Sequence, residues 1–261
     1  MFYSIGIDAG SVATKGVLFN GDIVETALMP TGWSPKDASC EVLELLLKKS
    51  GVNRDDVKKI IGTGYGRISM PFVDKAVTEI TCHAKGAHFL NANTRTILDI
   101  GGQDSKVISI DESGNVLDFS MNDKCAAGTG RFLQVMTATL GVDIAELDSM
   151  IDESVKPQPI SSMCTVFAES EVISLLAKGI DKKSVLLGLI HSISNRASSL
   201  MSKIPLTQDV AFTGGVARCK TTIRALEEKI GTPLFVSEHS QIVGALGAAV
   251  IAYNSVKKQQ A

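Results

Sequence analysis

Apolar residues open the chain in three short runs that are separated by glycine and asparagine turns. The runs cover Phe2–Asp8, Thr14–Phe19 and Asp22–Met29, and their β-branched content is typical of strands. Such short connections predict an antiparallel meander. Over Lys36–Ser50 the apolar positions recur at helical spacing and stop before Gly51, which predicts a helix.

Strands and helices alternate along the rest of the chain, which predicts an α/β protein. Further strands are expected at Val57–Gly62, Thr94–Ile100, Lys106–Ile110, Asn115–Phe119, Asp209–Phe212 and Pro233–Val236. Helices are expected at Asp74–Leu90, Gly130–Leu140, Val166–Ala177, Ser184–Ile204, Lys220–Ile230 and Gln241–Tyr253. No low-complexity linker separates these elements, so the parts of the chain should share an interface.

The turn after the first strand returns later in the chain. Asp8-Ala-Gly-Ser-Val-Ala-Thr-Lys and Asp99-Ile-Gly-Gly-Gln-Asp-Ser-Lys share an aspartate, a glycine, a hydroxyl residue and a lysine at the same spacing. Both segments lie between two apolar strands. Self-similarity at a distance of 91 residues indicates a duplicated unit. A chance match between two strand–turn–strand segments is the alternative.

Composition and charge exclude several classes of protein. The chain has 26 Lys and Arg residues against 28 Asp and Glu, which argues against nucleic-acid backbone binding and a polybasic membrane patch. The longest apolar stretch, Val243–Tyr253, is too short to span a bilayer. Five cysteines and the absence of a leader-like start predict reduced thiols in a cytoplasmic protein rather than a disulfide scaffold.

Glycine turns that follow strands are suited to binding phosphate. Glycine lets the backbone approach an anion, successive amides form a concave cradle, and an aspartate at the strand end orients hydrated Mg²⁺. The turns at Asp8 and Asp99, with a third at Phe212–Val216, therefore predict a nucleotide cleft between two lobes. They fit neither the dinucleotide fingerprint nor the P-loop, and Gly62–Arg67 lacks the P-loop lysine and hydroxyl residue.

These motifs, in this order, resemble those of the actin, hsp70 and sugar-kinase superfamily. The resemblance implies an α/β fold with two ribonuclease-H-like lobes and with ATP and Mg²⁺ between them. We expect the first lobe to comprise residues 1–72 and 241–261, and the second to comprise 73–240. The residues expected at the nucleotide are Gly10, Ser11, Val12, Ala13, Thr14, Lys15, Gly101, Gly102, Gly128, Thr129, Gly130, Gly214, Gly215, Val216 and Gln241.

Four polar residues of the two turns are the candidates for catalysis. Asp8 and Asp99 are expected to contact water molecules bound to Mg²⁺. Gln103 or Asp104 is expected to position the hydrolytic water, and ordinary surface hydrogen bonding is an equal alternative for both. Lys15 is expected to contact a phosphate, with a solvent-exposed strand-edge lysine as the alternative.

Two of the five cysteines, Cys125 and Cys164, precede predicted helices. A helix N-terminus lowers the pKa of a nearby thiol and stabilises an anion such as a thiolate-bound iron–sulfur cluster. Such a cluster takes four thiolates, so a twofold dimer would supply two from each chain. Spacing alone favours buried, packed cysteines at these positions. Packing is the favoured interpretation of Cys40, Cys82 and Cys219 as well.

The strings MNDKCAAGTGRF and CTVFAESEVIS resemble the ATP-dependent activators of 2-hydroxyacyl-CoA dehydratases, to which activators of benzoyl-CoA reductases are related. GTGYGR, DIGGQDSK and GALGAA fit the same family. The resemblance implies a homodimer bridged by one [4Fe–4S] cluster on Cys125 and Cys164 of both subunits. It also implies ATP-driven transfer of one electron to a partner iron–sulfur enzyme, with ferredoxin or flavodoxin as the electron source.

One segment departs from that family. Residues 31–35 read Thr-Gly-Trp-Ser-Pro, where dehydratase activators resemble GTGT-x-GP. This segment is closer to the subgroup associated with double-cubane cluster proteins, which makes such a protein the alternative partner. Two other functions remain open: a small-molecule kinase of the same superfamily, which needs a carboxylate base such as Asp104 but no cysteines before helices, and a filament or chaperone-like ATPase.

Overall fold

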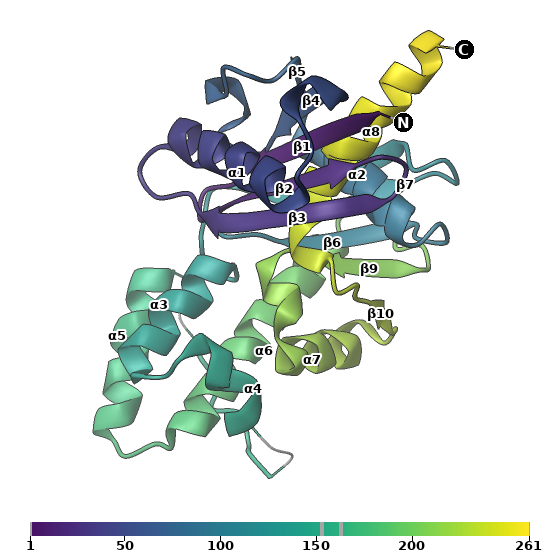
Figure 1. The fold of residues 1–261 in the computed structure, drawn as a ribbon. Coiled ribbons are helices and arrows are strands. Elements are labelled where there is room, and N and C mark those ends of the chain that lie inside the picture. The colour runs from purple at the N-terminus through teal and green to yellow at the C-terminus, as the bar shows by residue number, and fades with distance from the viewer. Residues whose placement is uncertain (1, 152–153, 162–163, 261) are drawn as a thin grey trace. The chain divides into compact units, whose positions relative to one another are not determined.

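The computed structural model describes residues 2–151, 154–161 and 164–260 (Figure 1). The chain divides into two compact units. The first comprises Met1–Ile97, Ile108–Phe119 and Ser237–Ala261, and the second comprises Leu98–Val107 and Ser120–Val236. Residues 73–97 therefore fall in the first compact unit, whereas the sequence analysis placed them in the second lobe. The boundary between functional lobes stays a prediction.

The first sheet confirms the predicted meander. Its order is β3-β2-β1-β4-β5. Antiparallel pairing joins β1 to β2 and β2 to β3, while β4 pairs parallel with β1 and β5 pairs parallel with β4. The strands are β1 (Tyr3–Ala9), β2 (Ala13–Phe19), β3 (Ile23–Pro30), β4 (Val57–Thr63) and β5 (Lys75–Ala76).

Helices cover both faces of this sheet. The side chains of β1 point alternately to one face and to the other. Ile5 and Ile7 pack in a core cluster with Val42 and Leu46 of α1 (Pro35–Ser50). On the other face, Ser4 donates a hydrogen bond to a carbonyl of α8 (Val243–Gln260) over 2.9 Å. Because successive side chains of a strand point to opposite faces, Asp8 follows Ser4 toward α8. The third helix of this unit, α2 (Glu79–Leu90), packs against α8.

The second sheet has the order β10-β9-β6-β7-β8. Its strands are β6 (Thr96–Ile100), β7 (Ser105–Ile110), β8 (Val116–Asn122), β9 (Val210–Thr213) and β10 (Leu234–Phe235). Reversed, this order matches the first sheet strand by strand: β6 takes the place of β1, β7 of β2, β8 of β3 and β9 of β4. The equivalence supports duplication over a chance match.

The remaining helices belong to the second unit. They are α3 (Gly130–Leu140), α4 (Leu147–Met150), α5 (Thr165–Ala177), α6 (Lys182–Met201) and α7 (Lys220–Ile230). Short 3₁₀ turns cover Arg54–Asp56, Arg67–Ser69, Ile144–Glu146, Gly215–Arg218 and Ser240–Ile242. One hydrophobic cluster joins α3, α5, α6 and α7 to the sheet, with Phe132, Val172, Leu189 and Phe212 fully buried.

Most predicted elements are present, several with bounds that differ by a few residues, and the largest differences are in two helices. The helix predicted from Asp74 begins at Glu79, because Thr78 caps it by accepting a hydrogen bond from the Thr81 N–H, and residues 75–76 form β5. The last helix extends to Gln260. Gln241 lies in the 3₁₀ turn before that helix rather than inside it. No helix among the described residues is long and apolar enough to cross a membrane.

Helix α4 was not predicted, and it carries Asp148, which caps α7. The Asp148 carboxylate accepts from the Lys220 N–H at 2.9 Å and from the Thr221 N–H and hydroxyl at 2.8 Å each. Burial opposes ionisation of this group. The hydrogen bonds from Thr221, Lys220 and Cys219 outweigh that effect and hold the pKa of Asp148 below its ordinary value.

We expect Asp148→Asn to lower the free energy of unfolding at pH 7 by about 1–2 kcal/mol. Because the folded pKa is depressed, the carboxylate contributes fully above the unfolded pKa of about 3.9, and the contribution is lost as pH falls through the folded pKa. The deficit of the variant should therefore shrink in acid, as urea titrations at several pH values would measure. Asp181→Asn is the control, since Asp181 precedes α6 without a side-chain cap. An equal loss in both variants would contradict this account.

Candidate functional site

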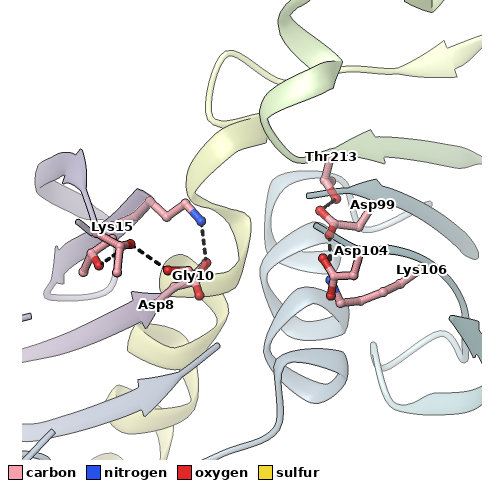
Figure 2. Close-up of polar contacts among 9 residues, drawn as sticks. Asp8, Gly10, Lys15, Asp99, Asp104, Lys106 and Thr213 are labelled. Atoms are coloured by element: carbon pink, nitrogen blue, oxygen red, sulfur yellow. Dashed lines mark hydrogen bonds and ion pairs between the residues drawn. The ribbon is translucent and has the colours of Figure 1, made fainter. Parts of the chain in front are cut away.

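The first glycine turn connects β1 to β2 and carries Asp8 and Lys15. The backbone N–H of Gly10 donates to the Ala13 carbonyl at 3.2 Å and closes the turn. Lys15 Nζ lies 3.1 Å from Asp8 Oδ2, and Figure 2 draws this ion pair as a dashed line. The Asp8 side chain is 8% exposed and that of Lys15 is 17% exposed. The turn thus holds a carboxylate and an ammonium side by side at the strand ends.

Neighbouring segments fix the position of this turn. The Thr31 hydroxyl donates to the Gly10 carbonyl at 2.6 Å, and the Gly66 N–H donates to the Ala9 carbonyl at 2.9 Å. Gly64 has φ +85°, and a Cβ atom there would lie 2.3 Å from Asp8 Oδ1. Only glycine combines that backbone conformation with so close an approach. The GTGYGR string therefore supports the Asp8 turn.

The second turn repeats this geometry 91 residues later. The Gly101 N–H donates to the Asp104 carbonyl at 3.0 Å, and Lys106 Nζ lies 3.1 Å from Asp99 Oδ2. These bonds match those of Gly10 and Lys15 atom for atom. The Thr213 hydroxyl adds a hydrogen bond of 2.8 Å to Asp99 Oδ1 (Figure 2). The internal repeat seen in the sequence is therefore a repeat of side-chain contacts as well.

The two lysines differ in their surroundings. Lys106 lies 2.8 Å from Asp104 Oδ2 in addition to Asp99, and its side chain is only 3% exposed. In the first turn the residue equivalent to Asp104 is Ala13, so Lys15 faces a single carboxylate. Two carboxylates more than compensate the charge of Lys106, whereas one carboxylate faces Lys15, which therefore keeps the greater capacity to attract an anion. The ion pair also occupies Asp104, which was a candidate for positioning water.

The third turn follows β9, and its equivalent in the first unit is the turn at Gly64. The sequence alone did not reveal that equivalence. Gly214 has φ +90°, and a Cβ atom there would lie 2.2 Å from the Ile100 carbonyl oxygen and 3.0 Å from Asp99 Oδ1. Gly64 occupies the same relation to Asp8 and Ala9. The shared signal was a Thr-Gly pair at the end of β4 and of β9. Val216 is buried behind this turn.

Residues 128–130 lie against the second turn. The N–H groups of Gly130 and Arg131 donate to the carbonyls of Gly101 and Gly102 at 2.9 and 2.8 Å, and the Thr129 hydroxyl bonds to Gly102 at 3.1 Å. The start of α3 is thereby fixed to the predicted phosphate turn. These two amides are already used, so contact of this segment with phosphate stays a prediction. Gln103 is exposed at the tip of the turn.

The two candidate cluster cysteines lie in the second unit. Cys164 is exposed and is the N-cap residue of α5. Cys125 is partly exposed, but α3 begins only at Gly130 with Thr129 as N-cap, so Cys125 does not directly precede the helix as predicted. Cys125 stands 91 residues after Ser34, the N-cap of α1, which is the spacing of the internal repeat. The connection from β8 to α3 is longer than the one from β3 to α1, so α3 begins some residues after Cys125.

Helices α3 and α5 pack side by side (Figure 1). The Thr139 hydroxyl lies 3.1 Å from Glu169 Oε1, which joins the two helices. Glu171 accepts hydrogen bonds from the Ser161 N–H and hydroxyl at 2.9 and 2.8 Å. These acidic residues therefore hold the segments around the cysteines.

The other cysteines have different environments. Burial raises the pKa of the Cys82 thiol to about 12, and burial also raises the pKa of Cys219. Both favour the neutral thiol, which is a poor metal ligand. Among the described residues no three His, Cys, Asp or Glu side chains gather as a metal site.

The two repeated sheets and the paired Asp–Gly turns define an ATPase fold of the actin and hsp70 type. A family model described as the BadF/BadG/BcrA/BcrD ATPase family matches residues 5–252. The chain belongs to this family.

Proteins of similar sequence align with nearly the whole chain. The "2-hydroxyisocaproyl-CoA dehydratase activator" of Clostridioides difficile is 46% identical and covers 99% of this chain and 97% of its own. The "(R)-2-hydroxyglutaryl-CoA dehydratase activating ATPase" of Acidaminococcus fermentans is 42% identical and covers 98% and 99%. The solved structure of the Clostridium difficile activator with bound ADPNP superposes with a TM-score of 0.93, at 44% identity, over 99% of this chain and 97% of that one.

A more distant solved structure shows how widely the fold occurs. The ROK hexokinase of Thermus thermophilus has a TM-score of 0.55 at 17% identity, and covers 98% of this chain and 100% of that one. At this level of identity the likeness concerns the fold alone.

Proposed function

We propose that this protein is an ATP-dependent one-electron donor that reduces a partner iron–sulfur enzyme. The observation that carries the proposal is the presence, in one short chain, of paired Asp–Gly–Lys turns and of two exposed or half-exposed cysteines near the starts of α3 and α5. The names of the relatives, which are activators of acyl-CoA dehydratases, support the same activity.

Each turn has a separate part in nucleotide binding. Asp8 and Asp99 would orient the water ligands of Mg²⁺, because carboxylates at strand ends suit a hydrated magnesium ion. Lys15 would attract the phosphates, since it faces only one carboxylate. The backbone of Gly214 and Gly215 would lie beside the nucleoside, where a side chain at 214 would collide with Ile100.

The cysteines would hold a [4Fe–4S] cluster between two copies of the chain. Four thiolates are needed and each chain offers Cys125 and Cys164, so a homodimer completes the set. When bound, such a cluster supplies single electrons at a potential set by its charge, hydrogen bonds and exposure. The free N–H groups at the start of α5 would stabilise its negative charge.

The partner is proposed to be a 2-hydroxyacyl-CoA dehydratase or a double-cubane cluster protein, with ferredoxin or flavodoxin as the electron source. Trp33, which marks the departure from dehydratase activators, is fully exposed between β3 and α1. Thr31, two residues earlier, binds the backbone of the Asp8 turn. The segment that differs between subgroups is thus joined to the nucleotide turn.

Purification without oxygen tests the proposal. We expect broad absorption near 400 nm, about four irons per two chains and a dimer in solution. Cys125→Ala and Cys164→Ala should each lose the absorption and the iron, while Cys219→Ala should retain both. Electron transfer to the partner should stop when ATP is omitted. An iron-free monomer that phosphorylates a small molecule would overturn the proposal in favour of a kinase.

A further inference from the structure

Thr31, directly after β3, is bonded to the Asp8 turn at three places. Its backbone N–H donates to the Val12 carbonyl at 3.0 Å. Its hydroxyl donates to the Gly10 carbonyl at 2.6 Å and lies 3.0 Å from the Thr14 hydroxyl. Thr31 is 4% exposed and Thr14 is fully buried, so water competes little for these bonds. One residue outside the turn therefore fixes alternate residues within it.

The hydroxyls of Thr14 and Thr31 form a chain of hydrogen bonds with a single direction. A hydroxyl has one proton to donate. The proton of Thr31 is used by the Gly10 carbonyl, so the Thr14 hydroxyl is the donor to the Thr31 oxygen. Successive hydrogen bonds in a buried setting polarise and strengthen one another. Thr14 therefore strengthens the bond by which Thr31 holds the Gly10 carbonyl.

The bond to the Gly10 carbonyl also sets the direction of the next N–H group. The peptide between Gly10 and Ser11 is trans, and in a trans peptide the carbonyl and the N–H point in opposite directions. The Ser11 N–H therefore points away from Thr31. It forms no hydrogen bond with the described residues, and Ser11 is only partly buried. An N–H presented in this way at a glycine turn is suited to an anion.

The second turn holds the equivalent carbonyl by different means. Gly101 corresponds to Gly10, and its carbonyl accepts from the Gly130 N–H at 2.9 Å. The residue that corresponds to Thr31 in the repeat is Asn122, whose amide donates to another carbonyl. Both turns thus fix the same carbonyl, the first with a side chain and the second with the start of α3. This recurrence indicates that both turns need that carbonyl in one orientation.

We propose that Thr31 is a positioning residue of the nucleotide site, which holds the Gly10 carbonyl and so directs the Ser11 N–H at a phosphate. The inference rests on the nucleotide part of the proposed function. The Thr31 hydroxyl makes both of its bonds to the chain itself, so it acts through the turn rather than by contact with the nucleotide. Its loss should weaken the binding of phosphates and leave the binding of the nucleoside unchanged.

Thr31→Val tests the proposal, because valine has nearly the shape of threonine and keeps the backbone bond to Val12, but cannot bind Gly10. The probe is ADPNP, an ATP analogue that is not hydrolysed, with Mg²⁺ and the full-length protein prepared without oxygen. Calorimetry should show ADPNP binding weakened by about tenfold, the effect of losing one hydrogen bond to a charged group. Adenosine has no phosphate, so its affinity should not change. A loss of stability alone would not separate the two ligands.

Thr31→Ser returns the hydroxyl and should restore ADPNP binding. Ser4→Ala is the matched control, because the Ser4 hydroxyl is also buried and donates to a backbone carbonyl, that of Ala249 at 2.9 Å, near the other end of β1. This variant should bind ADPNP like the unchanged protein. If Thr31→Val does not fold, Thr14→Val decides, because it removes only the second bond of the chain and should still weaken ADPNP binding several-fold.

The inference is overturned if Thr31→Val binds ADPNP as tightly as the unchanged protein, if Thr31→Ser does not restore binding, or if Ser4→Ala weakens it equally. These results would leave the proposed function in place, since the unchanged protein would still bind the nucleotide. An unchanged protein that binds no ADPNP would overturn the nucleotide part of the proposed function and this inference with it. Iron content and electron transfer are not measured, so the proposed cluster is tested separately.

Discussion

Lys106→Met is expected to destabilise the protein by about 3–5 kcal/mol, which is among the largest effects of any single polar substitution in this chain. Lys106 is buried between Asp99 and Asp104, at 3.1 and 2.8 Å. Removing its charge leaves two neighbouring carboxylates without their counter-ion, one of them only 2% exposed. The cost arises from that uncompensated buried charge rather than from the loss of an attractive pair.

Lys15→Met is the matched variant, because Lys15 stands at the equivalent position of the first turn. It is more exposed and pairs with one carboxylate, so we expect a loss of only about 1–2 kcal/mol. ATP binding should nevertheless fall by at least about tenfold if Lys15 contacts the phosphates. Urea unfolding and calorimetric titration with ATP measure both quantities. Equal destabilisation by the two variants would contradict this account, because it would show that the deeper burial of Lys106 does not affect stability.

Gly247→Ala is expected to destabilise the first unit by about 3 kcal/mol, although alanine favours helices over glycine by about 1 kcal/mol. A Cβ atom at this position of α8 would lie 1.7 Å from the Cys82 carbonyl oxygen and 2.8 Å from the Gly86 N. Both are backbone atoms of α2 and have no side-chain freedom. Helices α2 and α8 would therefore have to move apart.

The control for this effect is Asn254→Ala, which lies on the exposed side of the same helix. Surface substitutions of this kind change stability by about 0.5 kcal/mol or less. Thermal unfolding of the two variants under identical conditions makes the comparison. A Gly247→Ala protein as stable as the unchanged chain would mean that α8 is free to shift on α2.

Local sequence accounted for most of the helix and strand positions. Helix α1 has its start at Ser34 and Pro35 and its end at Gly51, and each of these residues acts on its own backbone. Helices α3 and α7 also have the predicted bounds, and each ends before a glycine in the left-handed conformation, Gly141 and Gly231. The predicted start of α2 was wrong, because Lys75 and Ala76 pair with β4. That pairing depends on a distant segment, which the periodicity of the local sequence does not reveal.

The candidate site was predicted in part. The repeat of Asp8 and Asp99 was visible because its spacing is preserved, and the structure adds that the side-chain contacts repeat too. The role of Gly64 as the counterpart of Gly214 was missed, because the spacing of the repeat is not preserved there. More chain separates β9 from β6 than separates β4 from β1. Helix α3 starts where the sequence predicted, but Cys125 does not directly precede it, because residues 126–129 form a turn against Gly102.

The sequence by itself determined most strands and helices, the three glycine turns and the repeat of the Asp8 turn at Asp99, because each is encoded by neighbouring residues acting on one stretch of backbone. Only the tertiary structure decided that Lys106 is buried between two carboxylates, while the equivalent Lys15 is more exposed and pairs with one. Those properties depend on burial and on side chains brought together from distant segments. Such encounters set the electrostatic environment of a residue, and no local pattern contains them.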